Sequence, residues 1–425
     1  MYGLYSYFLF LALLFYAPWY FIKMKLWKKE GLFLRERMGM KLPAPKPEAP
    51  SLWIHAVSVG EVLSLRRLVS ELRAKHPTWP VYFSTLTNTG YRVAKQTLSG
   101  IEEIFFVPLD FGWVVRRFFS ALRPRIFVLA ESEFWPHLLR QARRSCRSVI
   151  LVNGRMSRRS HRKYRRWRSL ARRVLGNIDY FLVQTEKDRE RLEGIGIPPQ
   201  KVEVAGNLKA EVRLPDVSAE ERNGLRAEFG LSSEKKVIIA GSTHRGEETL
   251  ILRAFAGARK IRPDLVMVIA PRHPERSSEV EKAGVEIGLG VMRRTQARPE
   301  KPWDLLILDT IGELAKFYAL ADLAFVGGSL IPHGGQNFLE PAYYGKPLCF
   351  GKHMENFAAL ADDFVSSGAA RVVLGREELE ELFLMKDEKK LEEMGRKARD
   401  LLSSLQGATA RTLQIIESQI GEGRG

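Results

Sequence analysis

The sequence has few cysteines and lacks the common nucleotide and metal motifs. Only Cys146 and Cys349 occur in 425 residues, which excludes a disulfide scaffold and a four-cysteine zinc site. There is no G-x-x-x-x-G-K-[S/T] phosphate loop and no G-x-G-x-x-G fingerprint. A D-x-D metal clamp and an H-x-x-x-H or H-E-x-x-H pair are also absent. We therefore expect neither a metal ion nor a cofactor.

Acidic residues are missing from one long segment. The chain has 67 lysines and arginines against 49 acids, which gives a formal net charge of +18. Between Arg140 and Arg173 there are fourteen basic residues and no acid. Such a segment is typical of proteins that bind nucleic acid, anionic lipid or a phosphorylated substrate. Because no recognised DNA- or RNA-binding motif accompanies it, we expect no nucleic-acid partner.

Charge is also missing from residues 2–22, which are rich in leucine, phenylalanine and tyrosine. A bilayer is crossed by about 20 apolar residues, and the lysines from Lys23 onward place the rest of the chain in the cytoplasm. We predict a single-pass membrane anchor at residues 1–22 and a basic, proline-rich linker at 23–50. An interfacial helix and a cleaved signal peptide are the alternatives, although no basic segment precedes the apolar run.

The remaining sequence alternates short apolar segments with helical ones, a pattern typical of parallel sheets covered by helices on both faces. The strands predicted in the first half are Leu52–Ser58, Val81–Thr87, Ile104–Pro108, Ile126–Ala130, Ser148–Val152, Tyr180–Gln184 and Val202–Ala205. Those predicted in the second half are Lys236–Ala240, Leu265–Ala270, Leu305–Leu308, Leu323–Val326, Pro347–Phe350 and Ala370–Val373. We predict an α/β protein with two doubly wound domains facing a cleft, residues 51–210 and 235–425, joined by a linker at 211–234.

Ligands of doubly wound folds bind where strands end, so the residues after each strand are candidates. In the first domain, Glu61 is a candidate general base on a hydroxyl, or it complements a helix dipole. Glu131 is placed for acid–base work or substrate binding, or it belongs to an ordinary helix start before Pro136. Lys209 is able to neutralise a developing negative charge, unless it is an ordinary surface charge.

In the second domain, several loops suit phosphate or ribose. The segment Gly241-Ser242-Thr243 follows a strand and precedes a helix, where backbone N–H groups bind anions. Arg272 follows the next strand and is able to bind a phosphate by donating two N–H groups. Gly312 begins another helix, and Glu340 is placed to accept hydrogen bonds from ribose hydroxyls. Together these loops predict a nucleotide site in the second domain.

These strand-end residues resemble the motifs of 3-deoxy-D-manno-octulosonic acid (Kdo) transferases of lipid A assembly. The run Gly327-Gly328-Ser329-Leu330-Ile331-Pro332-His333-Gly334-Gly335, continued by Asn337, Leu339, Glu340 and Pro341, is similar to the family signature. Further similar segments are Ala56–Glu61, Glu131–Pro136, Gly206–Lys209, Ala240–His244 and Pro271–His273. The chain departs from the family at Gln336, where histidine is common, at Ile311, where methionine is common, and at Gly154, where alanine is usual.

The resemblance implies an inverting, metal-independent glycosyltransferase of GT-B architecture, with two Rossmann-like domains. It would move Kdo from CMP-Kdo to a lipid A precursor (lipid IVA) in lipopolysaccharide core biosynthesis, at the cytoplasmic side of the inner membrane. By the same resemblance, Glu61 is the general base, and Glu131 and Lys209 stabilise the transition state. The residues that match the CMP-binding segments are Pro271, Arg272, Ile311, Gly312, Glu313, Asn337, Phe338, Leu339 and Glu340.

Two other functions remain open from the sequence. One is a GT-B transferase or epimerase with a different nucleotide-sugar donor, and the other is a membrane-tethered binding protein with an inactive cleft. The basic segment favours a phosphorylated lipid acceptor and anionic inner-membrane lipids as partners, with a solvated basic helix as its alternative. The residues expected to form this surface are Arg158, Arg159, Arg162, Lys163, Arg165 and Arg166.

Overall fold

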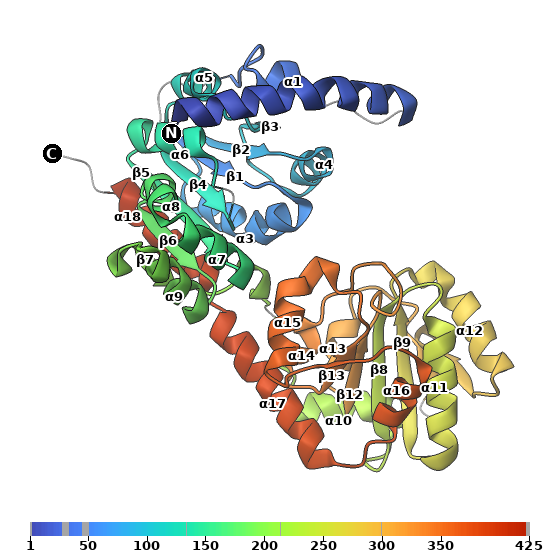
Figure 1. Ribbon diagram of the computed structural model, residues 1–425. Helices are drawn as coiled ribbons and strands as arrows, with labels where there is room; N and C mark the ends of the chain where they lie inside the picture. Colours follow the sequence, from blue (N-terminus) through green and yellow to red (C-terminus); the bar gives the residue numbers. More distant parts are fainter. Residues whose placement is uncertain are drawn as a thin grey trace. The chain divides into compact units, whose positions relative to one another are not determined.

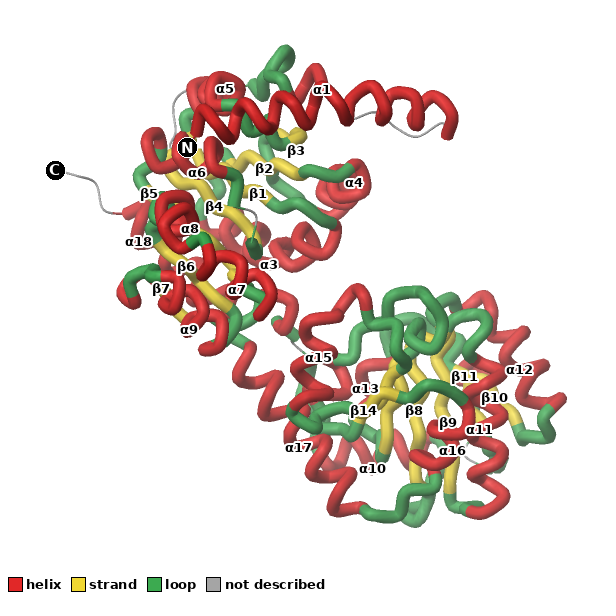
Figure 2. The backbone as a smooth tube through the Cα atoms, viewed as in Figure 1, coloured by secondary structure: helices red, strands yellow, loops and turns green. Residues whose placement is uncertain are grey.

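The computed structural model describes residues 2–27, 34–44, 51–132, 134–212, 214–298 and 300–421. The chain forms two compact units. Unit 1 contains Met1–Glu211 and Leu405–Gly425, and unit 2 contains Val212–Ser404. Each unit has a seven-stranded sheet in which all paired strands are parallel, with helices packed against it (Figures 1 and 2). The two predicted parallel sheets are therefore confirmed.

The sheet of unit 1 has the order β3-β2-β1-β4-β5-β6-β7. Its strands are β1 Ser51–His55, β2 Val81–Thr85, β3 Glu103–Phe106, β4 Pro124–Ala130, β5 Ser148–Gly154, β6 Tyr180–Val183 and β7 Val202–Val204. From β1 the chain proceeds to one edge of the sheet, and from β4 it proceeds to the other. The carboxyl ends of β1 and β4 therefore form the topological switch point, where doubly wound folds bind ligands.

Alternating residues of these strands fill the two faces of the sheet. Trp53, Phe127 and Leu151 join one buried cluster, whereas their neighbours Ile54, Val128 and Ile150 join another. Side chains alternate sides along a strand, so strands covered on both faces read as continuous apolar runs. This explains why the sequence located the strands of unit 1 to within about three residues at each end.

The helices of unit 1 connect its strands. They are α3 Val59–Lys75, α4 Asn88–Thr97, α5 Gly112–Leu122, α6 Pro136–Ser145, α7 Arg158–Arg166, α8 Arg168–Leu175 and α9 Glu186–Ile195, with the 3-10 turns η1 Pro199–Lys201 and η2 Leu208–Ala210. The predicted basic segment is therefore divided among α6, β5, α7 and α8. None of the residues of α7 is buried.

Unit 2 repeats the arrangement with the strand order β10-β11-β9-β8-β12-β13-β14. Its strands are β8 Lys236–Thr243, β9 Leu265–Pro271, β10 Val291–Arg293, β11 Leu305–Ile307, β12 Leu323–Val326, β13 Leu348–Phe350 and β14 Arg371–Val372. Strand β10 was not predicted, because only Met292 of its three residues is buried. The switch point of this sheet lies between β8 and β12.

The helices of unit 2 include one in the segment predicted as an interdomain linker. They are α10 Ala219–Glu228, α11 Glu248–Ile261, α12 Ser277–Glu286, α13 Leu314–Tyr318, α14 Leu339–Tyr343, α15 Ala358–Ser366, α16 Arg376–Phe383 and most of α17 Glu388–Leu405. Helix α10 begins with a capping box in which Ser218 and Glu221 exchange hydrogen bonds.

The C-terminal residues differ from the prediction, which assigned 235–425 to the second domain. Residues from Leu405 onward belong to unit 1, where α18 (Ala408–Gly421) packs against α3 and β5. Leu413 and Ile416 of α18 are buried in the cluster that contains Ile54 and Val128. An amphipathic pattern shows that a helix has an apolar face, but it does not show which sheet covers that face.

Helix α1 (Tyr2–Trp27) includes the segment predicted as a membrane anchor. Ser6 Oγ lies 2.8 Å from His137 Nε2, and the Tyr5 hydroxyl donates to the buried carboxylate of Asp110. Among the described residues, no helix is both long enough and apolar enough to cross a membrane, so the single-pass anchor is not confirmed.

The segment predicted as a linker, residues 23–50, is described in part. Residues 28–33 and 45–50 lie outside the described residues. Helix α2 (Leu34–Arg37) and the residues after it pack onto unit 1, because the buried Arg37 donates through Nε to Val107 O at 3.0 Å. Met38 and Leu42 pack against the core that contains Trp53. This part is thus a folded portion of unit 1.

Candidate active site

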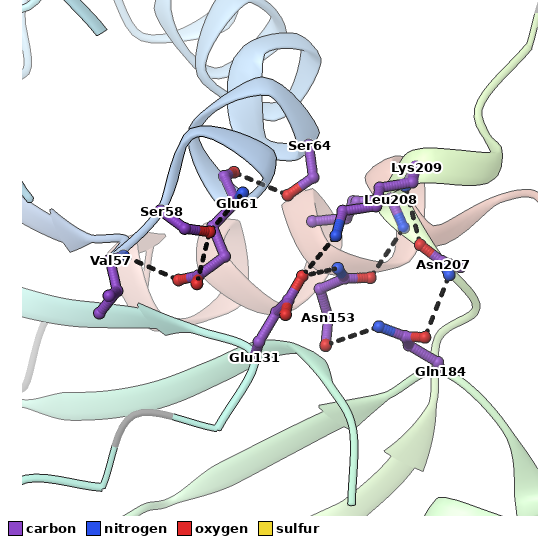
Figure 3. Close-up of polar contacts among 10 residues, drawn as sticks. All are labelled: Val57, Ser58, Glu61, Ser64, Glu131, Asn153, Gln184, Asn207, Leu208 and Lys209. Atoms are coloured by element: carbon purple, nitrogen blue, oxygen red, sulfur yellow. Dashed lines mark hydrogen bonds and ion pairs between the residues drawn. The ribbon is translucent and has the colours of Figure 1, made fainter. Parts of the chain in front are cut away.

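Glu61 lies in the first turn of α3, directly after the loop that follows β1. Ser58 caps this helix, and its Oγ accepts the Glu61 N–H at 3.4 Å. The Glu61 carboxylate in turn accepts the Val57 N–H at 2.8 Å through Oε2 and the Ser58 hydroxyl at 3.0 Å through Oε1 (Figure 3). With only 6% of its surface exposed, Glu61 is held in one orientation at the carboxyl end of β1.

Glu131 and Lys209 form an ion pair beside this carboxylate (Figure 3). Lys209 Nζ donates to Glu131 Oε1 at 2.8 Å, and the two side chains are 26% and 25% exposed. Glu131 is the first residue after β4 and has a φ of 56°, which is uncommon for a residue with a side chain. Such conformations cluster at functional sites, where the surrounding structure enforces them.

The position of Gly60 shows how close Lys209 lies to the first turn of α3. A Cβ atom placed on Gly60 would be 3.7 Å from Lys209 Nζ. The structure therefore brings together the three residues that the sequence nominated, Glu61, Glu131 and Lys209, at the switch point of unit 1 (Figure 3). Glu133, in the same motif as Glu131, lies outside the described residues.

A chain of buried amides fixes the backbone around Lys209. Asn207 Oδ1 accepts the Lys209 N–H at 2.9 Å, and Asn207 Nδ2 donates to Gln184 Oε1 at 3.0 Å. Gln184 donates to Asn153 O at 3.0 Å, while Asn153 Oδ1 accepts the Leu208 N–H at 3.0 Å. Asn153 Nδ2 lies 3.5 Å from Glu131 Oε1, which connects this chain to the ion pair. Sequence reasoning missed the role of Gln184, although it directly follows β6.

In unit 2, three histidines meet at the switch point between β8 and β12. The rings of His244 and His333 stack with centroids 4.5 Å apart, and His273 approaches His244 edge-on at 6.0 Å. Gln336, the departure noted from the sequence, places Nε2 3.0 Å from His244 Nε2. Burial, assisted by His333 and His273, lowers the pKa of His244 to about 4, so this imidazole is neutral at pH 7.

Buried Glu247 organises the loop that contains the glycines after β12. Its carboxylate accepts the N–H groups of His244 at 2.9 Å, Gly328 at 2.5 Å and Leu330 at 3.3 Å. Burial raises the pKa of Glu247, and the N–H groups act in the opposite direction. Sequence reasoning missed this residue. The sequence shows only that Glu247 is an acidic residue between a strand and a helix.

The residues nominated for CMP binding differ in accessibility. Arg272 is exposed after β9, with its N–H bonded to Thr243 O at 2.8 Å, whereas Pro271 is buried as the last residue of that strand. Ile311 is 89% exposed beside Gly312, which has a φ of 90°. Glu313 is paired with Arg294 at 3.1 Å.

The segment Asn337–Glu340 opens the short helix α14. Asn337 Oδ1 accepts the Leu339 N–H at 3.1 Å, and Asn337 Nδ2 donates to Glu340 Oε1 at 3.1 Å. Burial raises the pKa of Glu340. The side chains of Phe338 and Leu339 are buried in the core, where they hold this turn in place.

The nominated phosphate loop Gly241-Ser242-Thr243 is part of β8, because this strand continues for three residues beyond its predicted end at Ala240. Gly241 and Thr243 are buried, and a Cβ on Gly241 would lie 1.9 Å from the Tyr318 hydroxyl oxygen. Packing therefore explains this glycine. Only Ser242, with a φ of 55°, is partly accessible.

The six basic residues nominated as a membrane or acceptor surface all lie on α7 and are exposed. We call this set, Arg158, Arg159, Arg162, Lys163, Arg165 and Arg166, the α7 basic surface. Trp167 and Leu170, which follow α7, are 60% and 45% exposed. Across the described part of the chain, no group of three or more His, Cys, Asp or Glu side chains is placed to hold a metal ion.

Comparisons with known proteins agree on one family. Residues 33–212 match the family model described as 3-deoxy-D-manno-octulosonic-acid transferase (Kdo transferase). The 3-deoxy-D-manno-octulosonic acid transferase of Bordetella pertussis is 33% identical over 92% of this chain and 92% of its own length. The enzyme of that name from Haemophilus influenzae is 30% identical over 90% of each chain.

A solved structure shares the fold. MurG from Acinetobacter baumannii superposes with a TM-score of 0.56 and 14% identity, covering 87% of this chain and 99% of that chain. At this identity the likeness supports the two-sheet GT-B fold and nothing further.

Proposed function

This chain belongs to the family of Kdo transferases, and on that premise we propose that it moves Kdo from CMP-Kdo to a lipid A precursor in lipopolysaccharide core biosynthesis. It is thus a glycosyltransferase. The observation that carries the proposal is the buried Glu61 carboxylate beside the Lys209–Glu131 pair at the switch point of unit 1.

In the proposed mechanism, an acceptor hydroxyl oxygen attacks the anomeric carbon of Kdo. Its proton passes to the Glu61 carboxylate, which hydrogen bonds from Val57 and Ser58 hold in place. The new carbon–oxygen bond forms as the bond to the CMP phosphate oxygen breaks, and CMP leaves. One direct displacement inverts the anomeric centre and requires no covalent intermediate.

The Lys209–Glu131 pair has a separate role in this proposal. Lys209 presents an ammonium that is only partly neutralised by Glu131 and partly open to solvent. A preorganised cation of this kind stabilises negative charge that develops in the transition state. The hydrogen-bonded amides of Asn207, Gln184 and Asn153 hold the backbone of Lys209 in place while negative charge develops in the transition state.

We assign donor binding to unit 2. Exposed Arg272 and the loops around Gly328 and Asn337 lie at the carboxyl edge of the sheet, where nucleotides bind in doubly wound folds. Arg272 offers five N–H groups in a rigid fork that matches a phosphate. The accessible groups would hold CMP without a metal ion, since guanidinium and backbone N–H groups supply the charge stabilisation.

We further propose that unit 1 rests on the cytoplasmic face of the inner membrane. Support comes from the α7 basic surface, with Trp167 beside it, and from exposed apolar side chains of α1 such as Phe8 and Phe15. Basic residues near an anionic leaflet each contribute about 1 kcal/mol, and tryptophan favours the interface.

Glu61→Gln tests the mechanism. It keeps the shape of the side chain but removes the base, so we expect turnover to fall by roughly 10²- to 10⁴-fold with CMP affinity unchanged. Glu71→Gln is the matched control, because Glu71 lies on the same helix, where it forms a partly buried pair with Arg67 at 2.7 Å. Near-normal turnover of Glu61→Gln, with CMP binding intact, would show that Glu61 is not the base.

A further inference from the structure

Unit 1 contains a cavity at the opposite edge of its sheet from Glu61. Its volume is about 820 Å³, within the range of small-molecule sites. Arg125 near the start of β4, Ser148 at the start of β5 and Lys201 just before β7 line it. In a parallel sheet these amino ends lie at the edge away from the switch point. We call this space the amino-edge cavity.

The amino-edge cavity is lined by four cationic side chains and one acidic one, namely Arg125, Arg143, Arg147, Lys201 and Asp179. The acid is already engaged, because Asp179 Oδ2 accepts the Val149 N–H at 3.0 Å and Oδ1 lies 3.6 Å from Arg143. Lys201 Nζ donates to a carbonyl, Ile178 O, at 2.7 Å and pairs with no carboxylate in the described part of the chain. The cavity therefore carries excess positive charge.

Two lining groups have unused hydrogen-bonding capacity. Ser148 is 1% exposed, and its buried hydroxyl oxygen has no hydrogen-bond partner among the described residues. Buried hydroxyls are normally paired, so this hydroxyl is available as a hydrogen-bond partner for a ligand in the cavity. Within the same part of the chain, the half-buried Arg125 guanidinium makes no hydrogen bond or ion pair. Because the Arg125 side chain is half-buried, solubility does not explain its charge.

Helix dipoles do not account for the cluster. Arg143 lies in the last turn of α6, where a cation complements the negative helix end. Arg125, however, belongs to a strand. It directly precedes Ile126, the β4 residue paired with Ser148 of β5, and a cation at this position requires another reason.

We propose that the amino-edge cavity binds a small soluble ligand that carries two or more phosphate groups. Arginine and lysine donors match phosphate oxygens, and the Ser148 hydroxyl supplies a neutral donor at the base. The cations here converge on a concave space, whereas the exposed α7 basic surface suits a flat lipid layer. The proposal does not depend on the transferase activity.

The test uses the full-length chain and inorganic pyrophosphate as the probe, by isothermal titration calorimetry in the presence of saturating CMP. We expect one saturable site on the wild type. Arg125→Gln combined with Lys201→Gln should weaken binding by roughly a hundredfold or more, since two charged hydrogen bonds to phosphate are lost. Ser148→Ala should weaken it by roughly two- to tenfold. Arg144→Gln is the control, because Arg144 is exposed on α6 and does not line the cavity.

Thermal unfolding of each variant checks that it is folded. Absence of saturable pyrophosphate binding to the wild type would overturn the proposal, as would equal weakening by Arg144→Gln. Loss of binding in Arg272→Ala, but not in the double variant, would move the pyrophosphate site to unit 2 and overturn it as well. A parallel titration with phosphatidic acid vesicles tests the alternative that the cavity binds the phosphate of a lipid headgroup. If the double variant lost vesicle binding but kept pyrophosphate binding, the soluble-ligand assignment would be wrong.

Discussion

Lys209 donates to Glu131 at 2.8 Å although the two residues are 78 positions apart in the chain. They meet because parallel strands β4 and β7 deliver their carboxyl ends to one edge of the same sheet. Each side chain keeps about a quarter of its surface exposed, so the pair is available to a substrate. A partly buried pair that keeps contact with solvent contributes about 1 kcal/mol to stability, which suggests a role other than holding the fold.

The first prediction separates catalysis from stability at this pair. Lys209→Met should lower turnover by roughly 10²- to 10³-fold, because a preorganised charge is lost from the transition state. The free energy of unfolding should change by no more than about 1 kcal/mol. Steady-state kinetics and denaturant unfolding measure the two effects. Lys187→Met, at an exposed position on α9, is the control. A variant that unfolds more readily but turns over normally would assign Lys209 a structural role instead.

The second prediction concerns Arg272. Arg272→Ala should weaken CMP binding by roughly 10- to 100-fold, the range expected when a charged hydrogen bond to phosphate is removed. Calorimetric titration with CMP measures this directly. Arg253→Ala, at an exposed site on α11, should leave the affinity unchanged. Equal affinities for the wild type and Arg272→Ala would remove Arg272 from the donor site.

The third prediction tests the α7 basic surface. Replacing Arg162, Lys163 and Arg166 with glutamine should weaken binding to anionic vesicles by ~10²-fold at low salt, since three charges contribute about 1 kcal/mol each. The difference should shrink as salt shortens the Debye length. A vesicle co-sedimentation assay over a salt series measures it.

A matched triple variant provides the control for that experiment. Lys389, Lys390 and Arg396 are exposed on α17, in a part of the helix that belongs to unit 2, and their replacement removes the same charge. If both triple variants weakened vesicle binding equally, net charge rather than the α7 basic surface would be responsible. No effect of either variant at low salt would also contradict the assignment.

The fourth prediction concerns pH. His55 on β1 is fully buried, and burial lowers its pKa to about 4, with a smaller effect from Arg37. Between about pH 6.5 and 4 the unfolded chain binds a proton that the folded chain does not, so stability falls as pH falls through this range. From pH 7 to 5 the loss due to His55 amounts to about 2 kcal/mol.

Denaturant unfolding at pH 7 and pH 5 measures this effect as a difference between two proteins. His55→Gln lacks the titrating ring, so acidification should destabilise it less than the wild type by about the same 2 kcal/mol. Parallel pH profiles for the two proteins would show that His55 is protonated in the folded chain at pH 5.

The candidate-site side chains could be nominated from the sequence because they follow strands that are easy to recognise. Apolar runs such as Ile126–Ala130 mark buried strands, and parallel strands bring their carboxyl ends to one edge. Glu61, Glu131 and Lys209 could therefore be predicted as neighbours. Gln184 and Glu247 could not, because their functions depend on tertiary hydrogen bonds to Asn207 and to the Gly328 loop, which no local pattern encodes.

Other differences also arise from tertiary context. Helix α18 has an ordinary amphipathic sequence, and only the fold shows that it returns to unit 1. The basic run from Arg140 to Arg173 reads as one feature but is divided among α6, β5, α7 and α8. Part of it forms the α7 basic surface, while Arg143 and Arg147 line the amino-edge cavity. A count of charges along the sequence therefore treats two separate basic surfaces as one.

The central claim is tested most directly by incubating the full-length protein with CMP-Kdo and a tetraacyl disaccharide lipid A precursor, and by analysing the lipid with mass spectrometry. We expect the acceptor to gain Kdo, with release of CMP, in the wild type and in Glu71→Gln but at a greatly reduced rate in Glu61→Gln. An unmodified acceptor in the presence of the wild-type protein, or transfer from a different nucleotide sugar in place of CMP-Kdo, would contradict the account.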